Sequence, residues 1–131
     1  MVTENRFTIV EWAFEDDEYV SLFTGFCSDK KSYVAISLSK EVTSQDHELG
    51  LDGVHIEIND QIRSGYDLIK KGSVSGSQAI VLEFKPNAQK RLRIDDGSIT
   101  LEFEKLDTTS RENATRKIVE ILKSAGIPVE E

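Results

Sequence analysis

Short runs in which apolar and polar residues alternate fill the chain up to about residue 105. Residues 7–14 and 18–26 are rich in aromatic and β-branched residues and are separated by acidic residues, a pattern that predicts a β-hairpin. Residues 32–39 predict a third strand, with Val34, Ile36 and Leu38 on one face. The polar residues 40–53 predict a loop or an irregular turn, and residues 54–59 predict a fourth strand.

Turn-forming residues divide the segment that follows. Between residues 64 and 85 we expect two strands joined by a Gly/Ser turn and stopped by Pro86, and residues 87–92 are too short for more than a turn or two of helix. Asp96-Gly97 is a signal for a two-residue hairpin. It precedes a strand in which alternate apolar residues face one way, namely Ile99, Leu101 and Phe103.

An amphipathic helix is predicted over about residues 109–125. Its apolar residues recur at helical spacing and form a single stripe of Ala114, Ile118, Ile121, Leu122 and Ala125. Thr109, with Glu112 three residues later, predicts a capping box at the start of the helix. Gly126 and Pro128 predict its end, because glycine can adopt the left-handed conformation and proline prevents continuation.

The apolar stripe of this helix needs a surface to cover, and a sheet face is the only large apolar surface that the pattern provides. We therefore predict an α+β fold, with a mainly antiparallel β-sheet of about six or seven strands and the C-terminal helix packed on one face. The other sheet face is available to partners. A length of 131 residues fits one domain over residues 1–131, strand-rich over residues 7–105.

The negative charge of the chain is concentrated in its first half. Residues 1–60 hold 13 acidic and 4 basic residues, giving −9, whereas residues 61–131 hold 11 acidic and 12 basic residues, giving +1; together these give the net charge of −8. Nucleic-acid binding draws on clustered lysine and arginine, so we expect no nucleic-acid partner. The excess favours a basic partner, or serves only solubility.

Targeting and cysteine patterns point to the cytoplasm. The N-terminus lacks the pattern of a signal peptide, and no run approaches the roughly 20 apolar residues that span a membrane. The single Cys27 has no disulfide partner and no metal-ligand companion. We expect a cytoplasmic protein without membrane contact, metal or other cofactor.

The stretch GLDGVHIEINDQIRSGYDLI, residues 50–69, contains residue types that enzymes use. Alternation places Val54, Ile56 and Ile58 on one face of a strand, and the polar residues on the other face are His55, Glu57, Asn59 and Gln61. Two histidines and one cysteine without a paired ligand motif do not suit a zinc site, and no catalytic triad is apparent. A half-exposed strand followed by a turn accounts for the pattern without catalysis.

The same stretch, with three strands before it and an SITLEFEK strand and a terminal helix after it, resembles the tenth numbered immunity-protein family of bacterial polymorphic toxin systems. The resemblance covers roughly residues 8–124. The positions that match the motif of that family are Gly53, Glu57, Asn59, Asp60, Gln61, Ser64, Gly65 and Tyr66. The resemblance implies a non-catalytic cytoplasmic protein that binds a cognate toxin domain, often basic and nuclease-like, and blocks it.

We interpret the acidic first half as a surface that occludes such a toxin, with rapid, electrostatically steered association. Tyr66 is the candidate anchor, and the candidate charged contacts are Glu15, Asp16, Asp17, Glu18, Asp46, Glu48, Asp52, Glu57 and Asp60. A structural reading of the motif stays open, in which Gly65 permits a bend and Asn59 or Asp60 binds turn amides.

Two other classes of function stay open. The first is a small-ligand-binding or enzymatic domain that uses His55, Glu57 and Tyr66 on the polar sheet face. The second is a homodimeric scaffold module that pairs through a sheet edge or through the helix.

Overall fold

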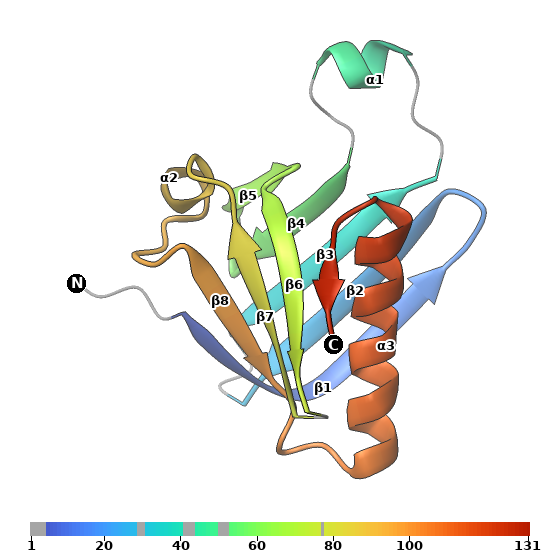
Figure 1. Cartoon of the computed structure of the whole chain (residues 1–131), viewed down its shortest axis with the longest axis vertical. Helices are drawn as coiled ribbons and strands as arrows, with labels where there is room; N and C mark the ends of the chain where they lie inside the picture. The colour runs from blue at the N-terminus through green and yellow to red at the C-terminus, as the bar shows by residue number, and fades with distance from the viewer. Residues whose placement is uncertain (1–4, 29–30, 41–43, 50–52, 77) are drawn as a thin grey trace.

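The computed structural model describes residues 5–28, 31–40, 44–49, 53–76 and 78–131 of the chain (Figure 1). Within these residues the chain forms nine strands and three helices. In chain order they are β1 (Arg6–Asp16), β2 (Val20–Cys27), β3 (Tyr33–Ser39), α1 (Ser44–Glu48), β4 (Val54–Ile58), β5 (Asp60–Tyr66), β6 (Ile69–Ser75), β7 (Ala79–Phe84), α2 (Ala88–Leu92), β8 (Ser98–Glu102), α3 (Thr108–Ser124) and β9 (Val129–Glu130).

The strands form one sheet in the order β5-β4-β3-β2-β1-β8-β7-β6-β9. All neighbours pair antiparallel except β1 with β8 and β6 with β9, which pair parallel. The predicted α+β fold, a mainly antiparallel sheet with a C-terminal helix, is confirmed, with nine strands rather than six or seven. None of the described helices is long and apolar enough to cross a membrane.

Strand β1 joins two parts of this sheet. Its residues Arg6–Thr8 pair with β8, and Glu11–Asp16 pair with β2 after a β-bulge between Ile9 and Glu11. We call β2–β5 together with residues 9–16 of β1 the first half-sheet. Residues 6–8 of β1 together with β6–β9 form the second half-sheet. The two half-sheets diverge from β1, and α3 lies alongside them at the open side (Figure 1).

The core lies between the inner faces of the half-sheets and the apolar stripe of α3. On β2, β3, β4, β7 and β8 alternate residues are buried, as in β4, where Val54, Ile56 and Ile58 are at most 1% exposed. From α3 the buried residues are Ala114, Ile118, Val119, Ile121 and Leu122. The helix approaches β6 closely at Gly72, where an added Cβ would lie 2.8 Å from Leu122 Cδ1.

Two sequence-based expectations about turns are wrong. Residues 60–63, expected to form a turn between the strand at 54–59 and the next strand, belong to β5, which pairs antiparallel with β4 at the edge of the first half-sheet. Asp96-Gly97 does not connect two strands of a hairpin, because α2 stands between β7 and β8. The chain leaves β7 at Pro86 and enters α2, so the Asp-Gly pair only leads into β8. The predicted loop at 40–53 contains the short helix α1.

The ends of α3 explain where the helix begins and stops. Asp107 is the N-cap, and its side chain accepts a hydrogen bond of 2.8 Å from the Ser110 amide. The predicted cap at Thr109 is therefore wrong, because that residue already lies inside the first turn. The predicted end is confirmed: Gly126 has a φ of 77°, and the Ile127 amide donates to the Leu122 carbonyl at 2.9 Å.

The capping geometry gives a test of the fold. We expect Asp107→Ala to lower the free energy of unfolding by about 1 kcal/mol, because it removes the acceptor for a first-turn amide. Thr109→Ala is the matched control and should change stability by less than about 0.5 kcal/mol. Urea denaturation of both variants measures the difference, and equal losses would contradict the assignment of Asp107 as the cap.

Candidate functional site

The outer face of the first half-sheet, the side turned away from the core, is the candidate functional site. Directly paired residues of neighbouring strands point to the same side of a sheet, so the register identifies the residues of this face. They form three rows across the strands: Glu15, Leu22, Ser37, His55 and Tyr66; Ala13, Thr24, Ala35, Glu57 and Ser64; and Glu11, Phe26 and Tyr33. We call these residues the outer face.

The charge of the outer face is of one sign. It carries Glu11, Glu15 and Glu57 and no lysine or arginine. Among the described residues, none of these glutamates forms an ion pair with a lysine or arginine. The face therefore presents carboxylates to solvent without compensating cations.

The second half-sheet differs, because its acidic residues are paired. Arg6 bridges to Glu102 at 2.8 Å. Lys71 reaches both Glu83, at 3.4 Å, and Glu130, at 2.8 Å. The hydrogen bonds that Lys71 donates to Glu130 and Glu83 raise its pKa, so it stays charged. The negative charge that is not compensated by lysine or arginine is therefore concentrated on the first half-sheet.

Glu57 and Asn59 hold Tyr33 in place. The Tyr33 hydroxyl donates a hydrogen bond to Glu57 Oε2. Asn59 Oδ1 accepts from the Tyr33 amide at 2.8 Å, and the Asn59 amide donates to the Tyr33 carbonyl at 3.1 Å. Burial, followed by the hydrogen bond to Glu57, raises the pKa of Tyr33 to about 12, so the hydroxyl keeps its proton and remains a donor. Two residues of the central motif thus fix one aromatic side chain on the outer face.

His55 and Tyr66 form a ring contact on the same face, with centroids 4.7 Å apart and planes tilted by 57°. Burial lowers the pKa of His55 below its ordinary value, while the Glu57 carboxylate acts in the opposite direction and Arg91 lowers the pKa further. The imidazole is therefore neutral at pH 7. In the described part of the chain, no group of three or more His, Cys, Asp or Glu side chains could hold a metal ion.

Two of the four acidic residues in the first hairpin turn are engaged within the fold. Asp16 points to the inner side of the sheet, where it bridges to Lys40 at 2.6 Å and accepts from Ser21 Oγ at 2.7 Å. These two contacts lower the pKa of Asp16. Asp17 accepts from the amides of Tyr19 and Val20, at 2.8 and 2.9 Å, which lowers its pKa and closes the turn. Only the other two acids, on either side of this pair, are exposed without such contacts: Glu15 on the outer face and Glu18 in the turn.

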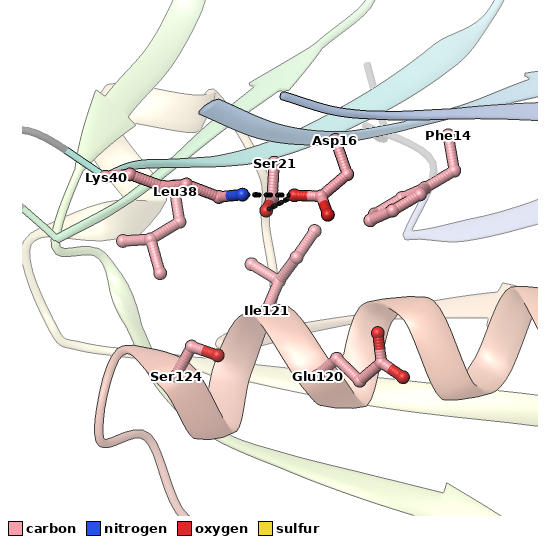
Figure 2. Close-up of a pocket in the computed structure, with 8 residues that line it drawn as sticks. All are labelled: Phe14, Asp16, Ser21, Leu38, Lys40, Glu120, Ile121 and Ser124. Atoms are coloured by element: carbon pink, nitrogen blue, oxygen red, sulfur yellow. Dashed lines mark hydrogen bonds and ion pairs between the residues drawn. The ribbon is translucent and has the colours of Figure 1, made fainter. Parts of the chain in front are cut away.

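A cavity of about 330 Å³ lies between α3 and the inner side of β1–β3, and Figure 2 shows the residues that line it. It is lined by Phe14, Asp16, Ser21, Leu38, Lys40, Glu120, Ile121 and Ser124. The side chain of Ile121 points from the helix toward the strands, and the Asp16–Lys40 ion pair closes the opposite side. The cavity lies across the sheet from the outer face, so it does not gather His55, Glu57 and Tyr66 into one ligand site.

The remaining predicted contacts lie near the ends of β4 and β5. Glu48 is exposed in α1. The side chain of Asp46 and the whole of Asp52 lie outside the described residues. Asp60 is exposed at the start of β5 and accepts a hydrogen bond of 3.1 Å from the Ile62 amide.

Several residues of the central motif have structural roles. Gly53 has a φ of 83°, which disfavours any other residue. Ser64 Oγ donates to the Gln61 carbonyl at 2.6 Å. Gly65 does not make the expected bend, because it lies within β5 and pairs with Ile56 of β4. An added Cβ would lie 2.8 Å from Leu68 Cδ1. Gln61 is exposed, and nothing in the structure explains its place in the motif.

Three residues of the outer face were not predicted from the sequence as site residues: Glu11, Phe26 and Tyr33. Alternation over residues 32–39 already predicts that Tyr33 lies on the face of the strand opposite to the face of Val34, which points into the core. For Glu11 no such signal exists, because the bulge in β1 reverses the alternation after Ile9. The outer face therefore combines Glu15, Glu57 and Tyr66, which were predicted, with residues that only the register reveals.

The contacts of Asn59 lead to a stability test of the motif. Asn59 has a φ of 62°, and its side chain binds the Tyr33 amide, so Asn59→Ala adds left-handed strain and removes an acceptor. We expect the free energy of unfolding to fall by about 2 kcal/mol. Gln61→Ala, at an exposed motif position, should change it by less than about 0.5 kcal/mol. If urea denaturation gives equal effects, the structural role of Asn59 is wrong.

The environment of His55 leads to a test by titration. The negative charge of Glu57 favours the imidazolium, so Glu57→Gln should lower the pKa of His55 further. NMR titration of the His55 ring protons measures this, and a rise in the pKa would contradict the arrangement.

Because the pKa of His55 in the folded protein lies below the ordinary value of 6.5, the unfolded chain takes up the proton first as the pH falls. The contribution of neutral His55 to stability is thus present above pH 6.5 and is lost below it.

Comparison with known proteins agrees with the resemblance seen in the sequence. The family model described as Immunity protein 10 matches residues 8–111, which include all residues of the outer face. A search of curated proteins gives no match. The family match covers most of the chain, from within β1 through β8 to the start of α3. The chain belongs to the Immunity protein 10 family.

Proposed function

We propose that this protein neutralises a cognate toxin domain of a polymorphic toxin system by binding it, without catalysing a reaction. The observation that carries the proposal is the family match over residues 8–111. The geometry supports binding rather than catalysis, because the polar residues of the central stretch serve the fold: Glu57 and Asn59 hold Tyr33, and His55 packs on Tyr66. Within this proposal the protein acts in the cytoplasm, where it meets a toxin that arrives there.

The charge distribution supports a basic toxin as the partner. The exposed acids Glu15, Glu18, Glu48 and Asp60 all belong to the acidic first half of the chain, and they contribute an attractive field for a cationic surface. Such a field speeds encounter and loses strength as salt screens it. Toxin domains that act on nucleic acid have cationic active sites, and they suit this field.

A titration tests stoichiometric neutralisation. We expect the activity of the toxin domain encoded beside this protein to fall linearly with added protein and to vanish at one equivalent, because each toxin is blocked by a bound molecule. The measurement is residual toxin activity at toxin concentrations well above the dissociation constant. Complete loss at a small fraction of an equivalent would show turnover and would contradict a non-catalytic mechanism.

A further inference from the structure

We infer that the outer face of the first half-sheet is the surface that binds the toxin, and that it receives an arginine-bearing basic surface. This inference rests on the proposed function and names the site and the chemistry of the partner. The outer face combines exposed carboxylates with aromatic side chains and contains no lysine or arginine.

The distribution of ion pairs separates this face from the other surfaces. On the second half-sheet, Glu83, Glu102 and Glu130 are paired with Lys71 or Arg6, so they offer little attraction to a basic partner. On α3, Lys117 lies 3.7 Å from Glu120, and the exposed surface carries both signs. Helix α2 carries Lys90 and Arg91 in its last turn, followed by Arg93, which would repel such a partner. Charge complementarity therefore selects the outer face.

Aromatic side chains on the outer face supply the apolar part of an interface. Phe26 is 39% exposed and stands opposite Glu11 on one side and Tyr33 on the other. Val10, in the adjacent bulge, is also 39% exposed. Arginine matches this combination, since its planar guanidinium stacks on aromatic rings and binds carboxylates through two hydrogen bonds. Phe26 is thus the better anchor than Tyr66, whose ring already packs on His55.

Glu57 is placed to receive a guanidinium with little loss of freedom. Its Oε2 accepts from the Tyr33 hydroxyl, which orients the carboxylate. The residues directly opposite it on β3 and β5 are Ala35 and Ser64, whose side chains are short, and Glu57 itself is partly exposed. An acceptor that is already oriented costs less entropy on binding. His55, neutral at pH 7, adds no competing positive charge beside it.

Charge reversal on two surfaces tests the inference. The double variant Glu11→Lys with Glu15→Lys changes two exposed residues of the outer face. The control is Glu104→Lys with Glu112→Lys, two exposed residues beyond β8 and on α3, and it makes the same change in net charge. The probe is the toxin domain encoded next to the gene of this protein, in a catalytically inactive form. We expect the outer-face variant to raise the Kd at least about tenfold and the control to raise it about twofold or less.

A third variant tests Glu57 itself while keeping its hydrogen bond. Glu57→Gln removes the charge, but the amide oxygen still accepts from the Tyr33 hydroxyl. We expect unchanged thermal stability within a few degrees and a Kd about tenfold higher, expressed mainly in the dissociation rate. This variant keeps the inference testable even if the charge-reversal variant does not fold.

The outcomes separate this inference from the proposed function. If the wild-type protein binds the toxin, and both Glu57→Gln and the outer-face double variant bind as tightly as the control, the inference is overturned and neutralisation by binding stands. If the wild-type protein neither binds nor protects against the toxin, the proposed function fails and the inference fails with it. Selective weakening by the outer-face variants supports both.

Discussion

The β-bulge in β1 determines which side chains of this strand reach the core. In an unbroken strand Glu11 would share the face of Phe7 and Ile9, which are buried. The bulge between Ile9 and Glu11 inserts one residue, so Trp12 and Phe14 turn inward instead. Trp12 stacks on Phe23 with ring centroids 5.7 Å apart, and its indole N–H donates to Ser110 Oγ of α3 at 2.8 Å. The same reversal directs Glu11 and Glu15 to the outer face. The bulge in β1 is thus the cause both of the contact between Trp12 and α3 and of the position of Glu11 and Glu15 on the outer face.

The central motif connects the fold with the proposed binding surface. Glu57 and Asn59 fix Tyr33 between them, and Gly53 supplies a backbone conformation that other residues avoid. The sequence alone is compatible with a role of this motif in contact or in structure, and for most of its residues the structure shows a role in the fold. Glu57 is suited to both roles, because one of its carboxylate oxygens accepts a hydrogen bond from Tyr33 and the residue is partly exposed between the short side chains of Ala35 and Ser64. A motif can therefore stabilise the fold and still hold the group that recognises a partner.

Alternation and helical spacing predicted the core-facing residues of β3 and β4, the amphipathic stripe of α3 and its glycine end. These are local patterns, imposed by burial of one face of each element. The errors arose where several local solutions compete. Asp107 and Thr109 are both good capping residues, and Asp96-Gly97 suits several kinds of turn, so tertiary packing makes the choice. The outer face could not be assembled from the sequence, because it depends on the bulge in β1 and on the order of strands in the sheet.

In the proposed complex, the outer face of the first half-sheet contacts the toxin. Hydroxyl-radical footprinting of the complex measures this directly, because it reports the solvent accessibility of individual side chains without any substitution. We expect lower reactivity of Phe26 and Tyr33 in the complex than in the free protein, with no change at Leu106 and Ile127, which flank α3. Protection of Leu106 and Ile127, with Phe26 as reactive as before, would contradict it.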